Sequence, residues 1–150
     1  MNKNAEKVMF QVGINALGIW LEKKGWELDI GYCNKDEMFA DTKQVFISSR
    51  QGPENQLYSL LHECGHILVQ QNKPSYEKNY PVASKAAKSP KNFKQIEKTK
   101  KYKLDVITEE IDAWKRGKTL AERLGIHLNE RKYNELAASC VHSYMEWATK

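Results

Sequence analysis

The chain has 150 residues, three cysteines and a formal net charge of +5. This length favours one domain with a core of its own. Three scattered cysteines are too few for a disulfide framework or a cysteine-based zinc site. No apolar run approaches the roughly eighteen residues of a membrane span, and no signal-peptide pattern follows Met1. We therefore expect a single domain, residues 1–150, in a reducing cytoplasm, and the pattern disfavours a secreted or membrane-bound protein.

The first 50 residues predict one helix followed by a small sheet. Apolar residues recur at helical spacing from Lys3 to Lys24, and Gly25 is a suitable C-terminal stop. Residues 26–32 alternate between apolar and polar, which is typical of a half-buried strand. Two further short strands are predicted at 38–40 and 44–48. We expect the three strands to form an antiparallel sheet directly before the next helix.

The next predicted helix, which begins near Gly52-Pro53, carries the motif His62-Glu63-Cys64-Gly65-His66. Residues four apart lie on one helix face, with Cβ atoms about 5–6 Å apart, so His62 and His66 can bind one metal ion. Glu63 can then reach a water molecule beside the metal. This is the H-E-x-x-H signature, in which two histidines bind zinc and the glutamate is the general base. Apolar residues flank the motif, and unpaired polar groups among them would be costly, which favours a bound metal.

A catalytic zinc site has three protein ligands and one open position, so a third ligand is required. A histidine six residues after His66 is excluded, because that residue is Asn72. The alternative is a glutamate from a later helix. Glu110 falls within an apolar stripe, where a carboxylate needs a partner, whereas Glu109 groups with polar residues on the side expected to face solvent. We therefore expect Glu110 to be the third ligand, with Glu109 as the alternative.

A lysine-rich segment at about 73–103 separates the motif from the glutamates. It contains ten lysines and two acids, a local charge of +8, so the remaining residues sum to 5 − 8 = −3. Its interleaved aromatic residues would suit a nucleic-acid surface, with lysines on phosphates and rings on bases. The absence of arginine argues against specific base recognition. We favour a solvated insertion, either a mobile loop or a lid over the cleft, with nucleic-acid binding as the alternative.

Two helices are predicted after the insertion, at 104–124 and from Glu130 to about Thr149, the second capped by Asn129. The H-E-x-x-H signature is typical of zinc peptidases. Such an enzyme also needs a second hydrogen-bond donor for the oxyanion that forms during hydrolysis. The candidates on or just before the last helix are His127, Tyr133, His142 and Tyr144. Of these we select His142. An exposed edge strand commonly holds a peptide substrate, and residues 44–48 fit that role.

With these motifs the chain resembles the gluzincins, zinc metallopeptidases that combine H-E-x-x-H with a glutamate from a downstream helix. Its size is similar to that of the ImmA/IrrE-like peptidases, and the resemblance covers roughly Trp26 to Gly125, apart from the insertion. The resemblance implies an α+β, zincin-like fold with an N-terminal helix, a small sheet, two metal-binding helices and a C-terminal helix. It also implies one Zn²⁺ ion held by His62, His66 and Glu110.

The chain departs from the gluzincin pattern four residues after Glu110. Gluzincins usually have Asp or Asn there, which orients a histidine ligand through a hydrogen bond. This chain has Trp114. The orienting group is therefore expected elsewhere, from Asp112 or from a backbone carbonyl.

Together these features predict a zinc-dependent metalloendopeptidase that acts on a specific protein or peptide substrate, with Glu63 as the general base. The alternative is a nucleic-acid-binding or regulatory protein with a zincin core that uses the 73–103 segment. Glu63 favours the enzyme, because a purely structural zinc site does not require it.

Overall fold

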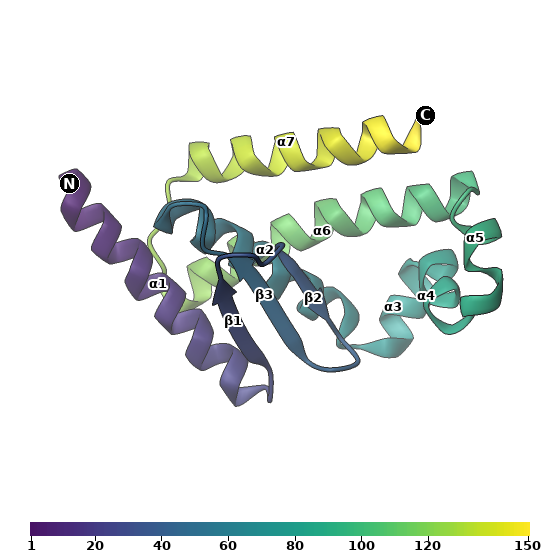
Figure 1. Cartoon of the computed structure of the whole chain (residues 1–150), viewed down its shortest axis with the longest axis horizontal. Coiled ribbons are helices and arrows are strands. Elements are labelled where there is room, and N and C mark those ends of the chain that lie inside the picture. Colours follow the sequence, from purple (N-terminus) through teal and green to yellow (C-terminus); the bar gives the residue numbers. More distant parts are fainter.

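A three-stranded sheet and seven α-helices make up the computed structural model, which describes all 150 residues (Figure 1). The strands are β1 (Glu27–Gly31), β2 (Glu37–Phe39) and β3 (Gln44–Ser48). The helices are α1 (Lys3–Lys23), α2 (Pro53–Gln70), α3 (Lys73–Asn79), α4 (Pro81–Lys88), α5 (Phe93–Ile96), α6 (Lys100–Leu124) and α7 (Glu130–Ala148), with a short 3-10 helix at Pro90–Asn92. This α+β arrangement confirms the expected fold class.

The sheet is mixed, so the expectation of a wholly antiparallel sheet is wrong. Its strand order is β1-β3-β2, with β2 antiparallel and β1 parallel to β3. Parallel strands need a return connection between them, and here β2 itself carries the chain back. The chain after β1 leaves the space of one strand between β1 and β2, and β3 occupies this space. Asp36 closes this arrangement by accepting a hydrogen bond from the Ser48 backbone N–H at 2.8 Å.

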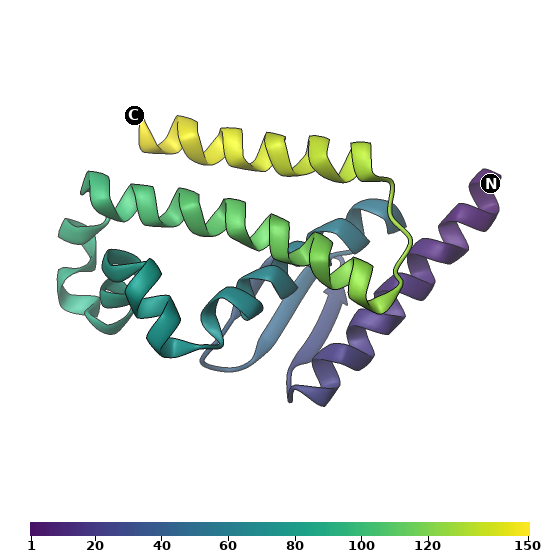
Figure 2. The ribbon, with the colours of Figure 1, turned by 180° about the vertical axis from the view of Figure 1, so that it is seen from behind.

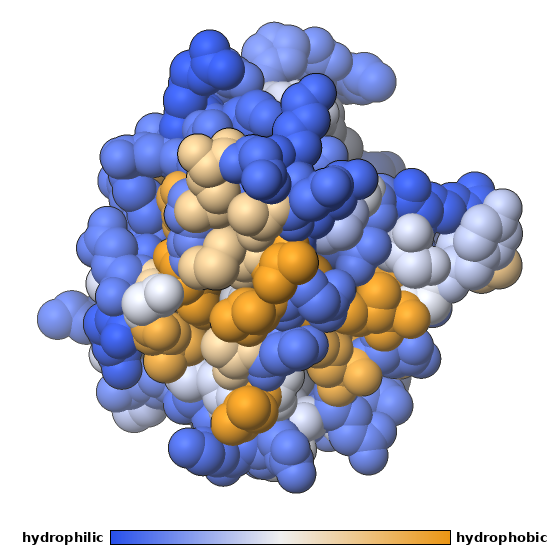
Figure 3. All heavy atoms as spheres, turned by 90° about the vertical axis from the view of Figure 1, so that its left-hand side faces the viewer, coloured by the Kyte–Doolittle hydropathy of each residue, from blue (hydrophilic) through white to orange (hydrophobic).

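The core lies where one face of the sheet meets α1 and α2. Val45 and Ile47 alternate along β3 and are fully buried, as are Leu17 and Leu21 of α1. The opposite side of α1 is exposed, and Figure 3 shows apolar side chains gathered in the middle of this face, with polar ones around them. No helix in the structure is both long and apolar enough to cross a bilayer.

Two glycines allow α2 and α6 to approach closely. A Cβ atom on Gly65 would overlap the carbonyl oxygen of Ala113 and lie 2.6 Å from its carbon, and a Cβ atom on Gly117 would lie 2.6 Å from the carbonyl oxygen of Leu61. These pairs show that the two helices run antiparallel, backbone against backbone. Figure 2 shows α6 crossing in front of α2 and α7 running back along α6. The close crossing brings the side chains that follow Leu61 against those that precede Ala113.

The lysine-rich segment is folded, which the prediction of a solvated loop did not anticipate. It forms α3, α4 and α5, and these lie beside the N-terminal half of α6 in both ribbon views (Figures 1 and 2). Helix α6 begins inside the predicted insertion, at Lys100, where the Thr99 hydroxyl accepts the backbone N–H of Tyr102. The segment therefore packs against α6 and the end of α2.

Candidate metal centre

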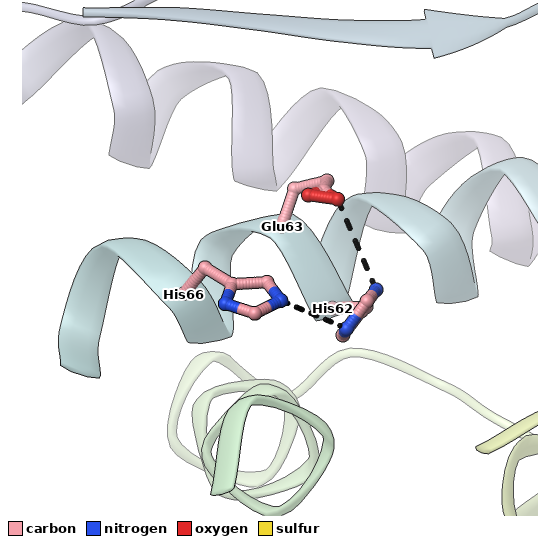
Figure 4. A group of neighbouring side chains, drawn as sticks. All are labelled: His62, Glu63 and His66. Carbon is pink, nitrogen blue, oxygen red and sulfur yellow. Dashed lines mark hydrogen bonds and ion pairs between the residues drawn. The ribbon is translucent and has the colours of Figure 1, made fainter. Parts of the chain in front are cut away.

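The H-E-x-x-H residues occupy the middle of α2, where it crosses α6. His62 and His66 stack four residues apart on one side, and their Nε2 atoms are 3.1 Å from each other (Figure 4). Glu110 of α6 reaches both rings, with Oε2 at 2.8 Å from His62 Nε2 and Oε1 at 3.1 Å from His66 Nε2. The structure therefore brings together the three residues predicted as ligands.

Glu109 does not face solvent, so that part of the stripe argument is wrong. Glu109 is only 7% exposed, and its Oε2 lies 2.6 Å from His66 Nδ1. His66 Nδ1 therefore donates a hydrogen bond to the Glu109 carboxylate, and His66 Nε2 stays available to bind a metal ion. A carboxylate behind a histidine in this way fixes the tautomer and orientation of a metal ligand. Glu109 thus occupies the orienting position that was expected for Asp112 or a backbone carbonyl, and Asp112 instead accepts a hydrogen bond from the Tyr80 hydroxyl.

Trp114 supports the other histidine by stacking. Its ring lies parallel to that of His62, with centroids 4.2 Å apart and planes 8° from each other. The nearest carboxylate oxygen to His62 Nδ1 is Glu63 Oε1 at 3.9 Å, which is too far for a hydrogen bond. The indole Nε1 of Trp114 is buried without an acceptor. The residue that replaces the usual Asp or Asn therefore holds the His62 ring by its flat face.

Burial and close pairing shift the pKa values of these groups strongly. Burial lowers the pKa of His66, but hydrogen bonds to Glu109 and Glu110 outweigh this effect and raise it to about 10. Burial raises the pKa of Glu110, but hydrogen bonds to His62 and His66 reverse the shift and lower it to about 2. For Glu63 burial dominates and raises the pKa, and the two histidines offset this only in part.

The donor set fits a divalent metal. Ligand atoms about 2.0–2.1 Å from a tetrahedral metal lie roughly 3.3 Å from one another, close to the spacing of the two Nε2 atoms and the Glu110 oxygens. Three buried carboxylates surround two imidazoles, so one dication would reduce the local charge from −3 to −3 + 2 = −1 when all three are ionised. His62, Glu63 and His66 can also be grouped as ligands, as can His62, Glu110 and Cys140. Two imidazole nitrogens and a carboxylate are a donor set that zinc accepts.

Glu63 lies beside these donors and lines the same cleft. The residue is only 5% exposed, and its carboxylate lies on a neighbouring side of α2, with Oε1 3.9 Å from His62 Nδ1 (Figure 4). The cleft has a volume of about 540 Å³. Its walls are the start of β2, helix α2, Glu109 and Glu110 of α6, and one side of α7. A carboxylate, the candidate metal ligands and an open space therefore meet at one place.

The strand beside the cleft is β2, so the choice of residues 44–48 as the substrate-binding edge is wrong. Strand β3 pairs on both sides and has no free edge. Glu37 and Met38 of β2 line the cleft, and β2 pairs only with β3, which leaves its outer edge free.

His142 lies outside the cleft, so its selection as the oxyanion donor is not supported. Its side chain is 72% exposed and pairs with Glu146 at 3.3 Å. Cys140 and Tyr144, four residues apart, share the face of α7 that lines the cleft. Residue 142 is two positions from each and is therefore rotated by about 200° around the helix. Of the other candidates, Tyr133 donates its hydroxyl to the Trp114 carbonyl and His127 stacks on Phe10, which leaves Tyr144.

Comparison with known protein families shows which family the chain belongs to. Residues 16–129, which are 114 of the 150, match the family described as the IrrE N-terminal-like domain, peptidase family M78. The chain belongs to this family. The match confirms the resemblance to the ImmA/IrrE-like peptidases and supports a metallopeptidase-type function. Comparisons with curated proteins and with solved structures gave no match.

In this member of the IrrE N-terminal-like family, the lysine-rich segment does not cover the cleft. None of its residues lines the cavity. Nine of its ten lysines are exposed, and Lys103 is partly buried over the Trp147 ring. The segment is therefore not a lid in this structure. Nucleic-acid binding through it stays a prediction that no observation here tests.

The position of His66 between two carboxylates predicts that metal binding releases a proton. At pH 7 the imidazole is protonated, because its pKa is raised to about 10, whereas a metal ligand must be neutral. We expect zinc binding near pH 7 to release about one proton and the affinity to rise about tenfold per pH unit between pH 6 and 8. Calorimetric titration in buffers of different ionisation enthalpy measures this number directly. Zinc binding that releases no proton would contradict the assignment of His66 as a metal ligand.

Proposed function

We propose that the chain is a zinc-dependent metalloendopeptidase that hydrolyses peptide bonds of a specific protein substrate. The observation that carries the proposal is the convergence of His62, His66 and Glu110 beside Glu63 at the floor of an open cleft. Membership of a peptidase family adds to it. A metal with a structural role alone would need neither the cleft nor the neighbouring carboxylate.

In this proposal His62, His66 and Glu110 hold the metal, and Glu109 and Trp114 keep the two histidines in position. Bound zinc supplies Lewis acidity and lowers the pKa of a coordinated water to near neutrality. Glu63 accepts a proton from the attacking water and later delivers it to the leaving amine. Its raised pKa, a result of burial, suits a group that must both take and give a proton near neutral pH.

Two further parts of the cleft would bind the substrate. Tyr144 lies on the side of α7 that lines the cleft, and its hydroxyl can donate a hydrogen bond to the oxyanion. The pKa of Tyr144 is raised by burial and by the nearby Glu110 carboxylate, so the hydroxyl keeps its proton. The free edge of β2 can pair with the backbone of an extended peptide. These features favour a protein or peptide over a small molecule as substrate.

The test is hydrolysis of a proteome-derived peptide library, with new termini identified by mass spectrometry. We expect the zinc-loaded protein to produce a restricted set of cleavages. Removal of zinc by a chelator should abolish them, and re-addition of zinc should restore them. Zinc-loaded protein that cleaves no member of the library and no intact protein in a native extract would contradict the proposal.

A further inference from the structure

The lysine-rich segment docks onto α6 through three acidic residues that share one face of that helix. Asp105, Glu109 and Asp112 are spaced by four and three residues, and each accepts hydrogen bonds from the segment. The donors are the Val82 and Ala83 backbone N–H groups to Asp105, the Tyr76 hydroxyl to Glu109 and the Tyr80 hydroxyl to Asp112. The segment therefore supplies hydrogen-bond donors to all three carboxylates, of which Asp105 and Glu109 are buried.

The middle contact differs from the other two because it leads to the metal centre. The Tyr76 hydroxyl donates to Glu109 Oε1 at 3.0 Å, and the other oxygen of Glu109 receives His66 Nδ1 at 2.6 Å and Gln70 Nε2 at 2.8 Å. Both oxygens of Glu109 are thus engaged, from α3 on one side and from α2 on the other. Tyr80, one turn after Tyr76 with its ring centroid 5.4 Å away, bonds Asp112, which contacts neither histidine.

From this geometry we propose that Tyr76 is a positioning residue of the metal centre, which acts through Glu109 on His66. The inference rests on the proposed function, because it assumes that His66 is a metal ligand. A carboxylate held at both oxygens has a fixed direction, so the imidazole that donates to it keeps its Nε2 atom directed at the centre. The inserted segment is then part of the site, although it lines none of the cleft.

Tyr80 provides a matched control for Tyr76. Both tyrosines lie in the same segment, and each donates its hydroxyl to an acid of α6. Replacing either by phenylalanine removes one hydrogen bond at the same docking surface. A purely structural role for Tyr76 predicts equal effects of the two changes on metal binding, whereas a positioning role predicts an effect of Tyr76→Phe alone.

The experiment measures the zinc dissociation constant of the full chain by competition with a chromophoric chelator. We expect Tyr76→Phe to weaken binding about tenfold and Glu109→Gln by about 10–100-fold. Tyr80→Phe should stay within about twofold of the wild type. The double variant Tyr76→Phe/Glu109→Gln should bind like Glu109→Gln alone, since the two residues act in one chain of contacts. In the cobalt-substituted protein, only Tyr76→Phe and Glu109→Gln should shift the visible absorption bands.

Thermal unfolding in the presence of chelator separates positioning from folding, since both tyrosine variants should lose similar stability. Equal weakening of zinc binding in both, or wild-type affinity and cobalt spectrum in Tyr76→Phe, would overturn the inference while leaving the proposed function intact. Additive effects in the double variant would also overturn it. A wild-type protein that binds no zinc would overturn the proposed function, and this inference with it.

Discussion

Replacement of Glu63 by glutamine is expected to reduce the rate of peptide hydrolysis by about 10²–10⁴-fold, the contribution typical of a general base. Glutamine keeps the size of the side chain but cannot accept the proton. The zinc content should remain that of the wild type, because Glu63 is not one of the three proposed ligands and its Oε1 lies 3.9 Å from His62 Nδ1. The peptide-library assay and elemental analysis of the same sample measure both quantities.

Glu135→Gln is the matched control, since it makes the same chemical change at an exposed position on α7 and should leave the rate unchanged. Full activity of Glu63→Gln with zinc bound would show that another group takes the proton. Loss of zinc along with activity would instead make Glu63 part of the binding site, as its grouping with the two histidines allows.

Replacement of Gly65 by alanine is expected to destabilise the protein by more than about 3 kcal/mol, at the upper end of overpacked substitutions. Helix propensity alone predicts the opposite sign, a gain of about 0.5–1 kcal/mol. Packing outweighs propensity, because the new Cβ atom would overlap the Ala113 carbonyl and force α2 away from α6. The same displacement would separate both histidines from Glu110. Urea unfolding with and without zinc measures the two effects.

Gly18→Ala tests the same substitution in a helix without the crowding. A Cβ atom on Gly18, in the C-terminal third of α1, would approach no atom closer than Leu28 Cδ2 at 4.0 Å. We expect this variant to be as stable as the wild type or more stable by about 0.5–1 kcal/mol. Equal stability of the two alanine variants would contradict the backbone contact between α2 and α6.

Local patterns in the sequence predicted much of this architecture. The helices at 3–23 and 130–148 lie within one residue of their expected ends, and the Asn129 side chain caps the last one as predicted. The buried helix around the motif was recognisable from its apolar flanks. Glu110 was recognisable because a carboxylate within an apolar stripe demands a partner, and its distances to His62 and His66 show which partners it has.

Features that depend on distant segments were missed. Alternation of apolar and polar residues predicts a strand but does not indicate which strands pair with it. The central position of β3 in the sheet was therefore not predictable. Glu109 was assigned to solvent because its partners, Gln70 and Tyr76, lie more than thirty residues earlier in the chain. Two patterns could have revealed it: three acids on one face of α6, and two tyrosines four residues apart in the preceding segment. Counting turns along α7 could likewise have separated Tyr144 from His142.

The central claim is that His62, His66 and Glu110 together hold one zinc ion, and metal content tests it most directly. We would measure zinc by elemental analysis in the wild type, Glu110→Ala and Glu109→Ala, each purified after zinc supplementation. The account predicts near-stoichiometric zinc in the wild type, none in Glu110→Ala, and retained but weaker binding in Glu109→Ala. No zinc in the wild type, or full retention in Glu110→Ala, would contradict it.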